Sequence, residues 1–422
     1  MLSYFKNTRS LFKTDGTVVR DTEVVRDTED VAYKKLTKTH KLKSRPAKSK
    51  IPYYKKVSCV LPKLNIYEPK IMKLYKKYPK LDCGNELQWV KLRNGSFQVN
   101  PQAKEQFGPL SCQAFPVIRN DYKSTYGPAI NGIENGGTID KDFYKVSCTG
   151  KDGKTFKDLI AGIRNDPDIE SRPIPDRSGG LGLDVFIFGQ DSTSRVAMHR
   201  HQPKMMDYLL NDAGAVELQG YGILGDGTPA ALMPILLGKR EKELPEARRG
   251  FKGAKPVDGH PWVWNQFKEM GYATMWSEQT PSIGTFHYRM LGFTNPPVDH
   301  YWRPFAILEK LTKSGLCHGS QSAYTVMLDY VRDMWIKYSD KRGKFGFIFP
   351  DIPSHRNNNE MSMLDEELRD YLKKLVDDGL LDNTLLIVMA DHGSRAGKVR
   401  ASDQGKLEER LPFFTLRWVK QN

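Results

Sequence analysis

The sequence predicts an α/β protein in which a smaller N-terminal α+β region precedes a largely parallel sheet covered by helices. The main reason is that, from Leu183 onward, apolar runs of strand length alternate with stretches of helical periodicity. These apolar runs are continuous, as expected for strands that are buried on both faces. A chain of 422 residues is also long enough for one large α/β domain and a smaller companion.

Composition divides the chain into three expected parts. Residues 1–50 contain the hexad VVRDTE twice in tandem before a Lys-rich run, so we expect a flexible basic arm. Residues 51–180 hold four of the five cysteines and many Gly and Pro residues, and we expect an irregular α+β region that ends in a linker. Residues 181–422 are expected to form the main domain, because the strand and helix patterns lie there.

The patterns in the main domain predict individual elements. The expected strands are Asp184–Gly189, Val216–Gly220, Ala273–Trp276, Phe345–Phe349 and Leu385–Met389. The expected helices are Pro203–Asp212, Pro229–Leu237, Val263–Met270, Tyr324–Tyr338 and Met361–Val376. The last helix is supported by Leu364, Leu368, Leu372 and Leu375, which fall on one face before a stop at Gly379.

Acidic residues and histidines directly follow three of the expected strands. Asp191 follows the first strand, Asp351 and His355 follow the fourth, and Asp391 and His392 follow the fifth. In open α/β sheets, ligands bind beyond the carboxyl ends of the strands. Carboxylate oxygen and imidazole nitrogen are ligands that zinc and similar divalent ions take in catalytic sites. These strand ends therefore predict a metal site.

A candidate nucleophile lies in the segment Gly225–Pro229. Thr228 precedes Pro229 and an apolar helical run, which predicts that Thr228 is the N-cap of a helix and Pro229 its first residue. A hydroxyl there lies beside free backbone N–H groups at the positive end of the helix dipole, which suits an alkoxide or a phosphoryl group. The alternative is that Thr228 only caps the helix. A Ser-His-Asp hydrolase is not expected, because Ser192 and Ser194 lack a Gly-x-Ser-x-Gly turn and a placed base.

Several of these segments resemble a known family. LDVFIFGQDSTSR, GYGILGDGTPAALMPILLGK, FGFIFPDIPSH, LLDNTLLIVMADHGSR and GKLEERLPFF are similar to the animal domain-of-unknown-function 229 family of the alkaline phosphatase/sulfatase-like superfamily. The resemblance implies an alkaline-phosphatase-like core with one or two divalent ions, zinc being the expected metal. It also implies a first metal site of Asp191, Thr228, Asp391 and His392, and a second site that begins with Asp351 and His355.

The resemblance implies a metal-dependent hydrolase or transferase that acts on phosphate esters through Thr228 as the nucleophile. A formylglycine-dependent sulfatase is not expected, because no cysteine lies in a Cys-x-Pro-x-Arg segment. No His follows His392, so one ligand of the second metal and the C-terminal part of the core are expected to be missing. The alternative is therefore a catalytically impaired or inactive relative that binds an extracellular partner or a polyanion.

Charge and cysteine usage bear on partners and location. The formal net charge of +15 favours anionic partners, and the basic N-terminal region is a candidate polyanion site without the pattern of specific nucleic-acid binding.

The five cysteines allow two disulfides among the first four, which leaves Cys317 unpaired, or five reduced thiols. The resemblance implies an extracellular or secretory-pathway location, although neither a signal peptide nor a transmembrane segment of about 18 apolar residues is visible.

Overall fold

The computed structural model describes residues 60–174, 180–339 and 342–418, almost all of which belong to one unit, Lys63–Asn422. The expected basic arm at residues 1–50 and Cys59 lie outside the described residues. Within the described ranges, no helix combines the length and the apolar character needed to cross a membrane.

The main sheet has seven strands in the order β11-β10-β14-β8-β15-β16-β9. The first five are parallel to one another, and β16 pairs antiparallel with both β15 and β9. The strands are β8 (Asp184–Gly189), β9 (Val216–Glu217), β10 (Ala273–Glu278), β11 (His300–Tyr301), β14 (Lys344–Phe349), β15 (Thr384–Met389) and β16 (Phe414–Arg417). Gly189 is in register with Met389, and Phe349 with Glu278, so four neighbouring strands end at one edge.

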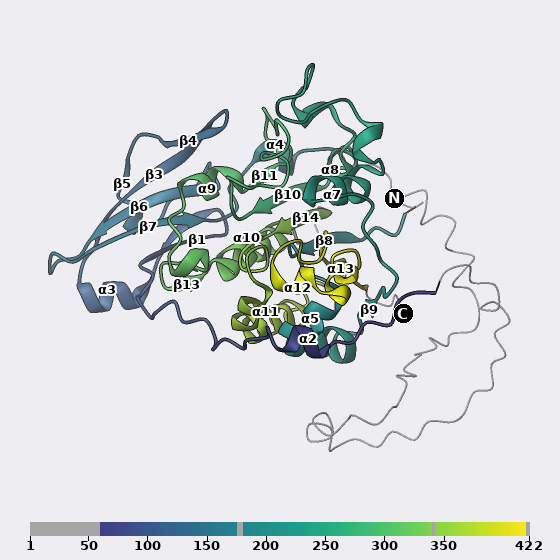
Figure 1. Ribbon diagram of the computed structural model, residues 1–422. Helices are drawn as coiled ribbons and strands as arrows, with labels where there is room; N and C mark the ends of the chain where they lie inside the picture. The colour runs from purple at the N-terminus through teal and green to yellow at the C-terminus, as the bar shows by residue number, and fades with distance from the viewer. Residues whose placement is uncertain (1–59, 175–179, 340–341, 419–422) are drawn as a thin grey trace. The chain divides into compact units, whose positions relative to one another are not determined.

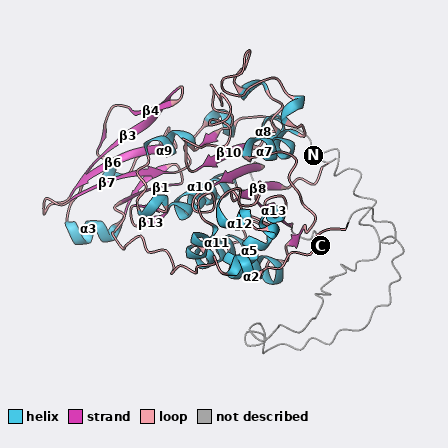
Figure 2. Cartoon of the chain, viewed as in Figure 1, coloured by secondary structure: helices cyan, strands magenta, loops and turns pink. Residues whose placement is uncertain are grey.

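Helices cover both faces of this sheet (Figure 1, Figure 2). Phe186 and Phe188 of β8 belong to a hydrophobic cluster with α10 and α11, whereas Ile187 belongs to a second cluster with α7 and α8. Because successive side chains of a strand point to opposite faces, the two clusters lie on opposite sides of the sheet. The helices are α5 (Arg195–His201), α6 (Pro203–Asp207), α7 (Thr228–Leu237), α8 (Val263–Glu269), α9 (Arg303–Leu308), α10 (Ala323–Tyr338), α11 (Asp365–Asp377), α12 (Gly397–Ala401) and α13 (Asp403–Glu408).

The expected fold class, with a largely parallel and helix-covered sheet, is confirmed. Strands β8, β10, β14 and β15 begin and end within two residues of their predicted bounds. The prediction of a strand buried on both faces at Val216–Gly220 is wrong. β9 is a two-residue edge strand beside β16, and the Val216 side chain is 47% exposed.

The N-terminal region forms a separate antiparallel sheet with the order β4-β3-β6-β7, and β5 also pairs with β3. Its core contains Trp89, Phe97, Tyr144 and Val146. The region thus has the expected α+β character. Its elements are α2 (Pro69–Met72), β1 (Val90–Arg93), β2 (Ser96–Val99), α3 (Pro101–Phe107), β3 (Ser111–Asn120), β4 (Lys123–Tyr126), β5 (Ile130–Asn131), β6 (Phe143–Thr149), β7 (Thr155–Ala161) and α4 (Pro167–Glu170).

Two disulfides join the described cysteines. Cys112 and Cys148 are direct partners across β3 and β6, and their Cα atoms are 4.1 Å apart. Cys83 is bonded to Cys317 of the main domain, with a Cα–Cα distance of 5.6 Å. Both the prediction that Cys317 is unpaired and the alternative of reduced thiols are therefore wrong for these four residues. Spacing along the chain does not reveal which Cα atoms the fold brings within bonding distance.

Two buried ionic clusters join the antiparallel sheet to the main domain. Asp142, directly before β6, lies 2.9 Å from Nδ1 of His300 on β11. His318 lies between two carboxylates, with its ring nitrogens 3.0 Å from Asp158 of β7 and 3.0 Å from Glu309 after α9. The orientation of the antiparallel sheet on the main domain is therefore fixed by charged contacts as well as by apolar packing.

Candidate active site

Four neighbouring parallel strands end in acidic residues at one edge of the main sheet. β10 ends at Glu278, while Asp351 follows β14, Asp191 follows β8 and Asp391 follows β15. All four side chains are buried. Parallel strands present their carboxyl ends at the same edge, which is why residues far apart in the sequence meet here.

Asp191, Asp391 and His392 form a buried cluster in which one ligand atom from each residue lies within 4.8 Å of the others. His392 Nε2 lies 3.1 Å from Asp391 Oδ2 and 3.9 Å from Asp191 Oδ1. In the part of the chain that the structure describes, this is the one such group of three metal-ligating side chains. Two carboxylates and an imidazole are a common ligand set for catalytic divalent ions.

The unpaired atoms of this cluster fit a divalent cation. Asp391 Oδ2 and His392 Nε2 are buried without hydrogen-bond partners. His392 Nδ1 lies 2.9 Å from the Gly393 carbonyl oxygen, so we assign the ring proton to Nδ1 and a lone pair to Nε2. A lone pair that faces two carboxylates is repelled by them unless a cation lies between the three groups.

Ser192 orients both carboxylates. Its hydroxyl donates a hydrogen bond to Asp191 Oδ1 at 2.8 Å, and its backbone N–H donates to Asp391 Oδ1 at 3.0 Å. The backbone N–H of His392 donates to the same Asp391 oxygen at 2.8 Å. Because these donors use Oδ1 of Asp391, Oδ2 is left for a metal. Ser192 reaches both carboxylates from a left-handed backbone conformation, with φ at +58°.

The electrostatics of the site also favour a cation. Burial, together with repulsion from Asp391 and Asp351, raises the pKa of Asp191 well above its ordinary value. Burial raises the pKa of Asp351 to about 6, although Thr280 donates a hydrogen bond that opposes this shift. Asp351 Oδ2 is buried without a partner. A bound divalent ion would stabilise the charged form of each carboxylate.

A small cavity joins Thr228 to these carboxylates. Its volume is about 10 Å³, which is roughly the space that one water molecule needs. It is lined by Asp191, Thr228, Glu278, Thr280, Ile283, Gly284, Thr285, Phe349 and Asp351. The structure therefore brings Thr228, the candidate nucleophile, to the same cavity as Asp191 and Asp351, two of the predicted metal ligands.

The prediction that Thr228 is a helix N-cap is wrong by one position. Gly227 is the N-cap of α7, with φ at +85°, and Thr228 is the first helical residue. Gly227 fits here because a Cβ would lie 2.7 Å from Arg395 Nη1 and 3.0 Å from Arg289 Nη1. Thr228 nevertheless remains at the N-terminus of a ten-residue helix, where backbone N–H groups have no intrahelical partner.

His355 is not a member of the three-residue cluster, although the charges of Asp391 and His392 act on its imidazole. Its side chain is exposed. Its backbone N–H donates to the Asp351 carbonyl oxygen at 2.8 Å, so His355 closes a turn beside the site.

Six of the nine residues that line the cavity were not predicted as site residues, among them the polar residues Glu278 and Thr280. Glu278 accepts hydrogen bonds from Arg303 Nη1 at 2.6 Å and from the Thr285 backbone at 2.9 Å. The backbone N–H of Thr280 donates to Asp351 Oδ1 at 3.0 Å. The signal for both was present, since they follow a predicted strand, but that strand was expected to end at Trp276 rather than at Glu278.

Comparison with known proteins identifies a family. The family model described as "Protein of unknown function (DUF229)" matches residues 75–421. A search of curated protein sequences found no match.

Similar solved structures include three bacterial proteins. The lipoteichoic acid synthase LtaP from Listeria monocytogenes is 12% identical, with 60% of this chain and 71% of that chain covered and a TM-score of 0.38. The C-terminal periplasmic domain of EcEptC from Escherichia coli is 14% identical, with 59% and 78% covered and a TM-score of 0.39. A protein in the alkaline phosphatase superfamily from Vibrio parahaemolyticus is 12% identical, with 60% and 68% covered and a TM-score of 0.39.

Proposed function

We propose that this chain, which belongs to the DUF229 family, is a metal-dependent hydrolase or transferase of the alkaline phosphatase/sulfatase-like superfamily that acts on phosphate esters. Asp191, Asp391 and His392 would hold a divalent ion, with zinc as the first candidate. Thr228 would serve as nucleophile and as a further ligand. The metal-dependent chemistry would belong to residues 181–422, and residues 51–180 would form the cysteine-containing N-terminal region.

One observation supports this proposal most strongly. Asp391 Oδ2 and His392 Nε2 are buried without hydrogen-bond partners and lie only 3.1 Å apart. A folded protein rarely leaves two such groups facing each other, because each buried polar atom without a partner costs about 1–3 kcal/mol. A cation would satisfy both atoms at once.

The proposed reaction is a displacement at phosphorus. A bound divalent ion would lower the pKa of the attacking hydroxyl and stabilise charge on the phosphoryl oxygens. Thr228 loses its hydroxyl proton to water, and its oxygen forms a bond to phosphorus while the bond from phosphorus to the alcohol oxygen breaks. The alcohol takes a proton from water. A water molecule or a second alcohol then cleaves the Thr228–phosphoryl ester, which gives hydrolysis or transfer respectively.

The chain offers features that suit these steps. Thr228 lies at the N-terminus of α7, where free backbone N–H groups and the helix dipole favour an anion. Ser192 fixes the orientation of both carboxylates through two hydrogen bonds. The cavity beside Thr228 has room for about one water molecule.

The second candidate function is a non-catalytic relative that binds an extracellular partner or a polyanion. The observation that favours it concerns His355, which is exposed and is not a member of the three-residue cluster. A second ion would then depend on Asp351 with one ligand fewer than expected.

Disulfide bonding supports the location that we propose for the chain. Cys83–Cys317 and Cys112–Cys148 are both present. Structural disulfides form and persist in oxidising compartments. We therefore place the protein outside the cell or in the lumen of the secretory pathway.

Thr228→Ala and Thr228→Ser test the proposed function. With an aryl phosphate as substrate, we expect Thr228→Ala to lower kcat at least about 10³-fold, because a nucleophile acts as a unit with its activating groups. Thr228→Ser should retain measurable turnover, since it keeps the hydroxyl. Asp391→Asn should reduce the metal content, whereas the Thr228 variants should retain most of the metal. A well-folded wild-type protein without metal or turnover would overturn the proposal and favour the binding protein.

A further inference from the structure

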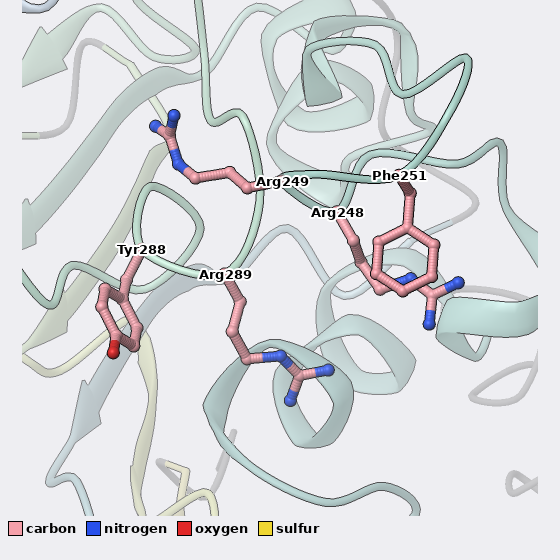
Figure 3. A pocket seen from close by; sticks show the side chains of 5 residues that line it. All are labelled: Arg248, Arg249, Phe251, Tyr288 and Arg289. Atoms are coloured by element: carbon pink, nitrogen blue, oxygen red, sulfur yellow. The ribbon is translucent and has the colours of Figure 1, made fainter.

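An open cleft lies beside the loop that carries Thr228. Its volume is about 400 Å³, and it is lined by Arg248, Arg249, Phe251, Tyr288 and Arg289. Figure 3 shows that these side chains come from two segments, residues 248–251 and residues 288–289, and that each segment contributes both arginine and an aromatic ring. Drug-sized ligands occupy pockets of roughly 300–1,000 Å³, so a small organic molecule fits this volume.

Arg289 connects this cleft to the candidate active site. Its Nη1 donates a hydrogen bond to the Asp226 carbonyl oxygen at 2.7 Å, two residues before Thr228. The same Nη1 atom would lie 3.0 Å from a Cβ at Gly227, the N-cap of the helix that Thr228 begins. Arg289 therefore contacts both the cleft and the loop that precedes Thr228.

The cleft has an excess of positive charge. Arg248 pairs with Glu246 at 2.5 Å, and Arg289 pairs with Glu241 at 3.2 Å. Arg249 donates to the His287 carbonyl oxygen at 3.1 and 3.0 Å, and among the described residues it forms no ion pair. The surrounding segment 239–255 contains seven Lys and Arg residues but only three Glu residues. An anion in the cleft would therefore be attracted by more cations than the local carboxylates neutralise.

The aromatic residues provide apolar contact area beside the arginines. Phe251 is 52% exposed and Tyr288 is 64% exposed. The Arg248 guanidinium carbon lies 3.9 Å from the centre of the Phe251 ring, which holds that arginine over the ring. Two aromatic side chains that remain this exposed, next to an arginine without an ion pair among the described residues, suit a surface that contacts a ligand.

We propose that this cleft is a substrate subsite that binds a second anionic group, located on the alcohol portion of the phosphate ester. Arg249 is its principal cation, Arg248 assists it, and Phe251 and Tyr288 contact the apolar atoms between the two anionic ends. The inference rests on the proposed function, because it takes the scissile phosphate to bind at Thr228. It narrows the substrate class to phosphate esters with at least one further negative charge.

Binding of non-hydrolysable analogues tests this subsite. The probes are alkylphosphonates of three to eight carbons and the ω-carboxyalkylphosphonates of the same lengths, so that each pair differs only in the terminal carboxylate. Calorimetry on the wild-type protein should show that, at one or two lengths, the carboxylate improves affinity by about 5- to 20-fold, as for a charge-assisted hydrogen bond. Arg249→Gln should reduce this preference to about twofold or less while leaving alkylphosphonate affinity unchanged.

Two further variants separate charge from folding. Arg249→Lys should retain part of the preference, because it keeps the charge without the guanidinium fork. Arg369→Gln, which removes an arginine of α11 that does not line the cleft, should leave the preference unchanged. Thermal unfolding of each variant checks that the fold is intact.

The outcomes distinguish the subsite from the proposed function. Equal affinity for both members of every pair, no binding of either phosphonate, or an equal loss of both affinities in Arg249→Gln would overturn the subsite. Turnover that depends on Thr228 would then still support the phosphate-ester enzyme. Conversely, a carboxylate preference that depends on Arg249 in a protein without turnover would establish the cleft as an anion site on a non-catalytic relative.

Discussion

At the scale of single residues, Ser192 fixes the orientation of Asp191 and Asp391, the two aspartates that we propose bind a cation. Its hydroxyl donates to Asp191 and its backbone N–H donates to Asp391, and Ser192 makes both bonds from a left-handed backbone conformation. Such a conformation costs an L residue roughly 1–2 kcal/mol compared with glycine. The backbone strain at Ser192 therefore accompanies a fixed orientation of the two aspartate carboxylates.

Ser192→Ala and Ser192→Gly separate these two effects. Both variants lose the hydroxyl that donates to Asp191, so metal affinity should fall about 10-fold in each, as for other residues that orient metal ligands. Only Ser192→Gly relieves the strain, and it should be more stable to urea than Ser192→Ala by roughly 1 kcal/mol. Metal titration and urea unfolding measure the two quantities. Unchanged metal affinity in both variants would show that the hydroxyl does not orient the ligand.

Residue identity at strand ends carried most of the information about the candidate site. Asp191, Asp391 and His392 were predicted because each follows an apolar run, and the structure brings all three together. Glu278 was not predicted, because the strand before it was expected to end at Trp276 rather than at Glu278 itself. That His355 is exposed could not be predicted either, since the path of the loop after Asp351 depends on contacts that are distant in the sequence.

At the scale of elements, α13 packs against the segment after β15 that carries Asp391 and His392, the two candidate metal ligands. Glu408 at its end accepts a hydrogen bond from Ser194 Oγ at 3.0 Å and pairs with Arg200 at 2.9 Å, and both partners are buried. Gly393, directly after His392, allows this close packing, because a Cβ there would lie only 2.2 Å from the Glu408 carbonyl oxygen.

Gly393→Ala should therefore push α13 away from the site. We expect a loss of about 1–3 kcal/mol in the free energy of unfolding, which is the usual cost of an added methyl group in a tightly packed interior. Metal content should fall as well, because His392 is the adjacent residue. Gly259→Ala is the matched control: a Cβ at Gly259 meets no atom within 4 Å, and the change should stay within about 0.5 kcal/mol. Equal stability of the two variants would contradict this account of the packing.

The elements themselves were predictable to different degrees. Buried parallel strands such as β8 and β15 are continuous apolar runs and were predicted closely, because burial on both faces leaves a strong signal. The short edge strand β9 and the antiparallel β16 carry a weaker signal, since their positions depend on pairing with a strand elsewhere in the chain. The pairing of Cys83 with Cys317 depends on the fold in the same way.

At the scale of the whole molecule, His318 joins the antiparallel sheet to the main domain. It lies 3.0 Å from Asp158 of β7 and 3.0 Å from Glu309, and its side chain is 6% exposed. Burial alone would lower the pKa of His318, but the hydrogen bonds and charges of Asp158 and Glu309 outweigh burial and raise the pKa to about 10. The imidazolium therefore persists at neutral pH in the folded protein.

This shift predicts how stability depends on pH. The pKa of an unfolded histidine is about 6.5, so between this value and about 10 the folded state binds one proton more than the unfolded state. The contribution of His318 is fully present below pH 6.5 and is lost as the pH rises through this window, at no more than about 1.4 kcal/mol per pH unit. Urea unfolding of the wild-type protein at pH 7, 8 and 9 should show this decline.

His318→Gln should lower the stability at pH 7 and remove most of the decline between pH 7 and 9, because glutamine leaves the two carboxylates without a titrating cation. His201→Gln is the matched control. Burial, followed by the charge of Arg200, lowers the pKa of His201 to about 3, so that side chain is neutral in both states across this range and its replacement should not alter the slope. A His318→Gln protein that retains the wild-type slope would show that another group titrates in this window and that His318 joins the two sheets by packing alone.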